Sequence, residues 1–194
     1  MRNLKSPLFA IVLLLAVLLL IGVPFLTRGS LVQEADPDDG QPIEWRSEAL
    51  GFRVTYPSKW QALTDPRELI GDNPTNLHAV AFVPNPGSKS LIIVYAQTLT
   101  TTETLDAYVA RQLQDLQGNE ANIAFAPPAS LKLTGGVDAR ETSALITTET
   151  PPRQQRVIMT VNGPRAYALY YTGPTDGRYA QAFDSLIQSF AFLP

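Results

Sequence analysis

The hydrophobic pattern predicts a series of short strands between residues 43 and 194. Residues 52–56 alternate apolar and polar positions, which is typical of a strand with one face on a core, and Pro57 ends the run. Residues 79–83 form another short strand, and the continuous apolar run 91–96 indicates a central strand buried on both sides. Strands are also expected at 130–134, 139–147, 155–161 and 166–172. Their Gly, Pro and Asn separators predict an antiparallel meander.

Two segments instead repeat at helical intervals. The first carries Leu105, Val109, Leu113 and Leu116, ends near Gly118, and follows a Thr100–Glu103 pair with capping-box spacing. The second places Tyr179, Phe183, Leu186, Ile187 and Phe190 on one face, with 189–192 as a further edge strand. Strands in runs with two segregated helices predict an α+β domain.

The N-terminal pattern is different, because positions 6–27 carry no charge and residues 8–21 are all apolar. Residues 7–27 are long enough to span a bilayer once, and we interpret them as a retained signal anchor. A cleaved secretory signal is the alternative, but small residues at a cleavage site are missing. Arg2 and Lys5 before the segment, against Arg28 after it, favour a cytoplasmic N-terminus, residues 1–6, with the rest outside the cytoplasm.

The remainder of the chain divides into an acidic Pro/Gly linker, residues 28–42, and one domain, residues 43–194. Downstream of Gly29 the chain has twelve basic and eighteen acidic residues, a net charge of −6. This charge argues against nucleic acid as a partner and against adhesion to anionic lipid. The envelope partner that we expect is therefore a protein, besides the bilayer around residues 7–27.

Composition removes most catalytic chemistry. The chain has no Cys and one His, which excludes thiolate metal sites, cysteine nucleophiles and His-pair metal centres. His78 is expected in a loop before a strand, and no Gly-x-Ser-x-Gly elbow accompanies it. No catalytic residue, cofactor or metal is therefore assigned, and we expect a protein that is not an enzyme.

Four residues are candidates for an exposed binding patch: Trp60, Tyr170, Arg153 and Arg156. Strand alternation places Tyr167, Leu169 and Tyr171 on one face and Tyr170 on the other, so most of these tyrosines are expected in the core. Arg153 and Arg156 flank a strand, where they could meet an acidic partner or guard a sheet edge.

Three motifs carry a family resemblance: Gly51-Phe52-x-Val54-x-Tyr56-Pro57-x-x-Trp60, Gly136-Val137-Asp138-Ala139 and Phe183-x-x-Leu186-Ile187-x-Ser189-Phe190. Together they make residues 43–193 similar to the PsbP-like superfamily, which includes PsbP, LpqN and DcrB-type bacterial envelope proteins and a Ran-binding nuclear import factor. The resemblance implies an α/β/α sandwich around a central antiparallel sheet. Bacterial members are typically exported, anchored and non-enzymatic. The metal-binding histidine of PsbP has no match here.

Two hypotheses for function follow. The first is a membrane-tethered, non-catalytic extracytoplasmic module that docks on another envelope protein or complex. The alternative is a receptor domain for a small molecule or ion in transport or sensing, which the aromatic residues and the acidic charge would favour.

Overall fold

A computed structural model of the chain describes residues 41–64, 77–119 and 123–194. Within these ranges the chain forms ten strands, two α-helices and one short 3-10 turn. In chain order they are β1 (Ile43–Ser47), β2 (Phe52–Tyr56), β3 (Gln61–Leu63), β4 (Leu77–Val83), β5 (Leu91–Thr98), α3 (Leu105–Asn119), β6 (Ala129–Lys132), η1 (Thr134–Gly136), β7 (Asp138–Ile146), β8 (Arg153–Asn162), β9 (Arg165–Pro174), α4 (Ala180–Ser189) and β10 (Ala191–Phe192).

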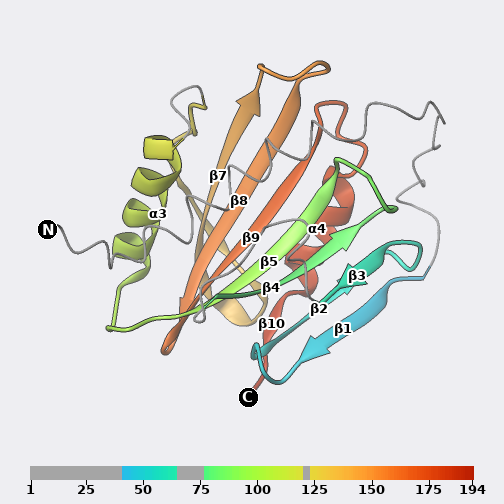
Figure 1. Cartoon of the computed structure of the whole chain (residues 1–194). Helices are drawn as coiled ribbons and strands as arrows, with labels where there is room; N and C mark the ends of the chain where they lie inside the picture. Colours follow the sequence, from blue (N-terminus) through green and yellow to red (C-terminus); the bar gives the residue numbers. More distant parts are fainter. Residues whose placement is uncertain (1–40, 65–76, 120–122) are drawn as a thin grey trace, which may run out of the picture.

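Seven of the strands form one sheet in the order β3-β4-β5-β9-β8-β7-β6. Every neighbouring pair is antiparallel, and β6, β7, β8 and β9 lie side by side in chain order, so the predicted meander is confirmed. The two helices lie on opposite sides of this sheet (Figure 1). The predicted α+β sandwich around an antiparallel sheet is therefore present in the described residues.

Each face of the sheet has its own hydrophobic core. The core on the α4 face includes Tyr167, Leu169 and Tyr171, and the core on the α3 face includes Tyr170, so the predicted alternation along β9 is confirmed. β5 is buried on both faces from Leu91 to Gln97, as its continuous apolar run predicts. Burial of both faces explains why the central strands lack polar alternation.

A second, smaller sheet has the order β1-β2-β10 and covers part of the α4 core. Arg53 of β2 pairs with Arg46 of β1 on one side and with Ala191 of β10 on the other. The edge strand predicted near residues 189–192 is thus confirmed as β10. β1 was not predicted, although Ile43 and Trp45 alternate with Glu44 and Arg46, and the three-residue β3 was not predicted either.

Two local predictions are wrong. The cap of α3 is Thr104, whose Oγ1 accepts a hydrogen bond from the Ala107 main-chain nitrogen at 3.3 Å, and not Thr100. His78 lies within β4, where it pairs with Ala96, and not in a loop. Its side chain is exposed, because alternation along β4 turns it away from the core that takes Leu77 and Ala79.

The predicted anchor, residues 7–27, and nearly all of the predicted linker, residues 28–42, lie outside the described residues. Among the helices that the described ranges contain, none combines the length and the apolar character needed to cross a bilayer.

Candidate functional site

The side of the sheet that faces α4 carries a charged cluster centred on Arg156 of β8. The guanidinium lies 2.7 Å from Glu141 of β7 and 2.7 Å from Asp184 of α4, and it stacks over the Phe183 ring at 5.0 Å. Burial acts to lower the pKa of Arg156, but the hydrogen bonds to Asp184 and Glu141 outweigh it and raise the pKa. Arg156 is therefore a fixed cation that joins β7, β8 and α4.

Arg153, at the start of β8, is also engaged. Its Nη2 donates a hydrogen bond to the main-chain oxygen of Lys89, and its Nη1 lies 3.8 Å from a carboxylate oxygen of Glu149. Because β8 lies between β7 and β9, neither Arg153 nor Arg156 guards a sheet edge, and that interpretation is wrong.

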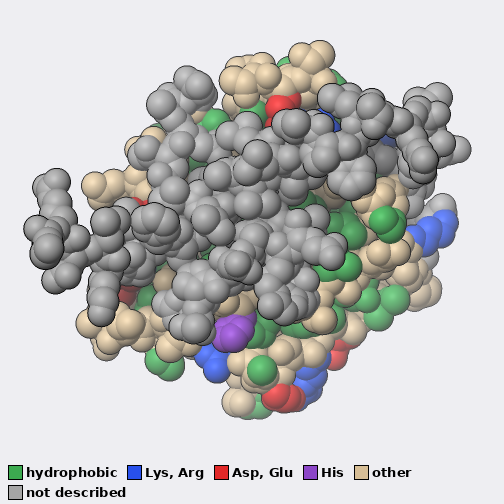
Figure 2. All heavy atoms as spheres, in the orientation of Figure 1, with side chains coloured by type: hydrophobic (Ala, Val, Ile, Leu, Met, Phe, Trp, Pro, Cys, Tyr) green, Lys and Arg blue, Asp and Glu red, His purple; other side chains and the backbone are tan. Residues whose placement is uncertain are grey.

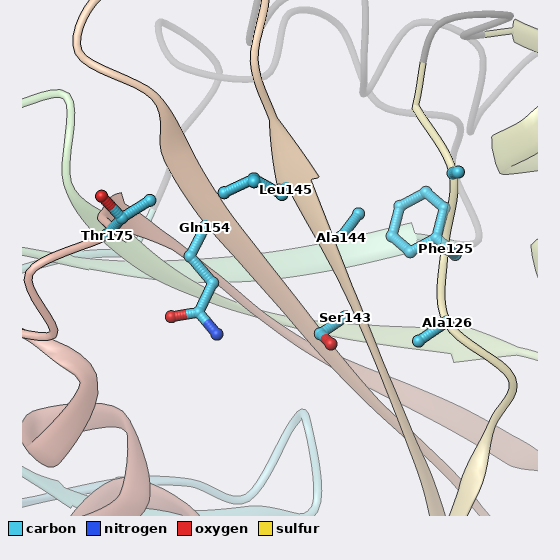
Figure 3. A pocket seen from close by; sticks show the side chains of 8 residues that line it. Phe125, Ala126, Ser143, Ala144, Leu145, Gln154 and Thr175 are labelled. Atoms are coloured by element: carbon cyan, nitrogen blue, oxygen red, sulfur yellow. The ribbon is translucent and has the colours of Figure 1, made fainter.

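Next to this cluster an open hollow forms between the segment 124–126 and the strands β7 and β8. It has a volume of about 560 Å³ and is lined by Ala124, Phe125, Ala126, Ser143, Ala144, Leu145, Gln154 and Thr175. Figure 3 shows Gln154 and Ser143 from neighbouring strands, with Phe125 and Ala126 on the facing segment. None of these lining side chains carries a charge.

Pairing of the 124–126 segment with β7 builds the hollow. Phe125 forms an isolated antiparallel bridge with Ala144, and the Ala126 nitrogen donates to the Ser143 oxygen at 2.8 Å. Thr142 Oγ1 then donates to the Ala126 oxygen at 2.6 Å. Pro127 and Pro128 follow directly, and since proline has no N–H to donate, regular pairing resumes only at β6.

Leu145 is the exposed apolar residue of the hollow. Its exposed fraction is 53%, and only Ile43 is also a large exposed hydrophobic residue in the described part of the chain. The hollow was not predicted from the sequence, because it depends on a bridge between residues 125 and 144 that no local pattern signals.

The structure does not join the four predicted patch residues into one surface. Trp60 is 3% exposed and belongs to the α4 core, where its ring meets Tyr179 edge to face at 5.6 Å. Tyr170 is 5% exposed and belongs to the opposite core. The prediction of an exposed patch at Trp60 and Tyr170 is therefore wrong, whereas Arg156 pairs in register with Ser143, which lines the hollow.

Under α3, three tyrosines lie close together: Tyr95, Tyr108 and Tyr170. The Tyr95 and Tyr170 rings meet edge to face at 5.4 Å. Burial raises the pKa of Tyr170, and the nearby Tyr108 and Asp115 raise it further. Burial likewise raises the pKa of Tyr108. These phenols therefore stay protonated at neutral pH and act as packing groups.

Metal binding finds no support in the described ranges, which contain no group of three His, Cys, Asp or Glu side chains placed to hold an ion. Acidic side chains pair with basic ones at several places instead. Lys132 and Asp138 lie 2.7 Å apart, and this contact lowers the pKa of Asp138.

No protein-family model and no curated protein matches the chain. Solved structures do. Cyanobacterial PsbP (CyanoP) of Synechocystis sp. PCC 6803 matches with a TM-score of 0.57 and 12% identity over 84% of this chain and 98% of its own. The chain has a PsbP-like fold.

Two further structures share this PsbP-like fold. A protein of Bacteroides thetaiotaomicron matches with a TM-score of 0.53 and 16% identity over 78% of this chain, which spans only 48% of that protein. A mutant of the protein Mog1 matches with a TM-score of 0.50 and 9% identity over 79% of this chain and 96% of its own. At these identities the likeness concerns the fold.

Proposed function

We propose that this chain is a non-catalytic binding or assembly module. In this proposal residues 7–27 tether it to a membrane, and the PsbP-like domain, residues 43–194, docks outside the cytoplasm on another envelope protein. The observation that carries the proposal is the uncharged hollow beside Arg156, with Leu145 exposed at its wall.

Several features of the domain support a non-catalytic role. The sequence holds no Cys and one His. The phenols under α3 are buried and have raised pKa values, so they are poor proton donors or acceptors at neutral pH. A general base would need a group whose pKa lies near the working pH, and these groups lie far from it.

The chemistry of the hollow favours a partner segment without charge. Its lining consists of small, aliphatic, aromatic and amide side chains, and the adjacent Arg156 is already neutralised by Glu141 and Asp184. A charged partner group would lose its hydration there and find no free counter-ion on Arg156. An apolar side chain flanked by main-chain polar groups would gain from burial against Leu145.

The substitution Leu145→Asp tests the proposal. We expect it to abolish recovery of a stoichiometric partner when the tagged full chain is isolated from membranes, because the carboxylate would be desolvated in the hollow. Ile43→Asp is the matched control, since Ile43 is the other large exposed hydrophobic residue of the described ranges. It should leave recovery unchanged.

A photo-reactive residue at position 145 should also form a covalent product with the same partner. The proposal fails if no partner is recovered with the native chain, or if both Asp variants recover it equally. A ligand present at a hundred times its Kd stabilises a protein by about 2.7 kcal/mol. If a small solute raised the unfolding free energy of the native chain by this amount but did not raise that of Leu145→Asp, the receptor alternative would be favoured.

A further inference from the structure

A second interaction surface lies at the β1 edge, which we define as the outer edge of Ile43–Ser47. In the described residues β1 pairs with β2 on one side only and is an outermost strand of the small sheet. An edge strand presents a row of N–H and C=O groups that can pair with a further strand. Proteins usually block such edges with charged side chains.

The charges of β1 do not suit that protective role against a copy of the same strand. Glu44 and Arg46 are two residues apart, so they project from the same face of the strand, and both are exposed. A guard against self-pairing would carry one sign, because antiparallel pairing would then bring like charges together. With opposite charges at this spacing, the strand is complementary to an antiparallel copy of itself.

We propose that two copies of this chain associate by antiparallel pairing of their β1 edges about a two-fold axis at Trp45. This register places Glu44 of each copy opposite Arg46 of the other, and Ile43 opposite Ser47. Directly opposed charges of unlike sign stabilise a strand pair, and like charges destabilise it. The interface is isologous, as a two-fold dimer requires.

Other registers are disfavoured by the same side chains. An axis at Glu44 would oppose two carboxylates, and an axis at Arg46 would oppose two guanidinium groups. A shift of the pairing register by one residue would turn the face of β1 that carries Trp45 towards solvent. Trp45 packs on Phe52 and Phe82, with ring centroids 5.2 and 6.2 Å apart, so that face is fixed towards the core.

The existing partners of these charges allow the new pairs. Glu44 lies 3.1 Å from Arg53, and Arg46 lies 2.6 Å from Glu48, in ion pairs that are about half exposed or more. Such surface pairs hold their side chains weakly. Pairing of two copies would extend them into a row of alternating charge, and acidic and basic side chains already lie next to each other over β1 and β2 in Figure 2.

The strands β1 and β7 lie on opposite sides of the molecule in Figure 1, and the hollow is lined by residues of β7, so self-association at β1 would leave the hollow open. Ile43 is 42% exposed, and in the dimer it would lie diagonally next to Trp45 of the other copy. The inference therefore goes beyond the proposed function and does not depend on it.

Disulfide trapping tests the register, because the chain has no native cysteine. Glu44→Cys and Arg46→Cys are made separately in the full chain with tags of different size, mixed in detergent solution and oxidised mildly. The Cβ atoms of directly opposed residues are about 4.5–5.5 Å apart, which is close enough for a disulfide to form. We expect the mixed disulfide in large excess over both homodisulfides.

Lys132→Cys mixed with Arg46→Cys is the control for random collision, since Lys132 is exposed on β6. A statistical mixture of the three products, or no more product than the Lys132 control gives, would overturn the proposal.

A charge-exchange experiment separates a lost interface from a misfolded chain. Glu44→Lys and Arg46→Glu should each weaken self-association measured by sedimentation roughly three- to ten-fold, because each creates two like-charge contacts. Mixing the two variants restores both unlike pairs, so association between them should return to the native level. If the mixture associates no better than either variant alone, complementary charges do not hold the dimer.

Discussion

Two tyrosines of β9 differ in one hydrogen bond, although both belong to the α4 core. The hydroxyl of Tyr167 donates to the Leu50 main-chain oxygen at 2.9 Å. The hydroxyl of Tyr171 is buried and has no hydrogen-bond partner among the described residues. Its ring packs closely over Gly173, where an added Cβ would lie 2.6 Å from Tyr171 Cζ. Gly173 therefore provides the space that this ring needs.

Removal of each hydroxyl should have opposite effects on stability. Tyr167→Phe leaves the Leu50 oxygen without its donor and should cost about 1 kcal/mol of unfolding free energy. Tyr171→Phe removes a buried hydroxyl that makes no hydrogen bond, so it should be neutral or stabilising. Urea unfolding of the two variants measures the difference. A Tyr171→Phe loss as large as that of Tyr167→Phe would contradict the assignment.

For single residues, the sequence pattern predicted which face of the sheet a side chain lies on, but not whether that side chain is exposed. Period-two alternation assigned Tyr167, Tyr170 and Tyr171 to the correct faces of β9. The same alternation does not say whether a face is covered, and so Tyr170 was considered for a patch although α3 covers it. Trp60 lies just outside a strand, where no period applies, and its burial follows from packing against Tyr179.

Among the elements, α4 depends on a small number of polar contacts besides its apolar face. Arg156 binds Asp184 and stacks on Phe183, and Ser189 Oγ accepts a hydrogen bond from the Thr55 nitrogen of β2 at 2.8 Å. The helix is thus joined to both sheets, and only 17% of the Arg156 side chain is exposed.

Arg156→Met should destabilise the fold by about 2 to 3 kcal/mol. The substitution keeps an apolar side chain over Phe183 but leaves Glu141 without its cation, and breaking a partly buried ion pair costs more than breaking an exposed one. Lys132→Met is the matched control, because its pair with Asp138 is mostly exposed, and it should leave the stability nearly unchanged. If thermal unfolding showed the same loss of stability for Arg156→Met and Lys132→Met, the stabilising role of Arg156 would be contradicted.

Long, regular elements were predicted from the sequence, and elements held by distant partners were not. The meander β6–β9 and both helices follow from turn residues and apolar spacing. β1 owes its existence to β2, and the 124–126 segment owes its path to Ala144. The hollow could therefore not be predicted from a local pattern, whereas Arg156, which pairs with Ser143 of its lining, was named as a candidate from the sequence.

For the molecule as a whole, tyrosine ionisation reports on both cores. Burial raises the pKa of Tyr95, Tyr108, Tyr167, Tyr170 and Tyr171, in the last case to about 12. The folded chain therefore holds phenol protons that the unfolded chain releases near pH 10. Their stabilising contribution is complete below pH 10 and is lost as the pH rises through the folded values.

We expect the free energy of unfolding to fall steeply above pH 10. The phenolate absorbance of most of the seven tyrosines should appear only with loss of the circular dichroism signal. A spectrophotometric titration checks this. Full ionisation near pH 10 with the fold intact would show that the phenols are accessible to solvent.

The small sheet has a consequence for how the chain is made. Its central strand, β2, is synthesised well before its partner β10, and the Leu193 nitrogen donates to the Gly51 oxygen at 3.0 Å. Phe190 and Phe192 reach the aromatic cluster around Phe52 only at that point. Until β10 has been synthesised, β2 has an open flank, so the small sheet cannot close while only the preceding residues are available.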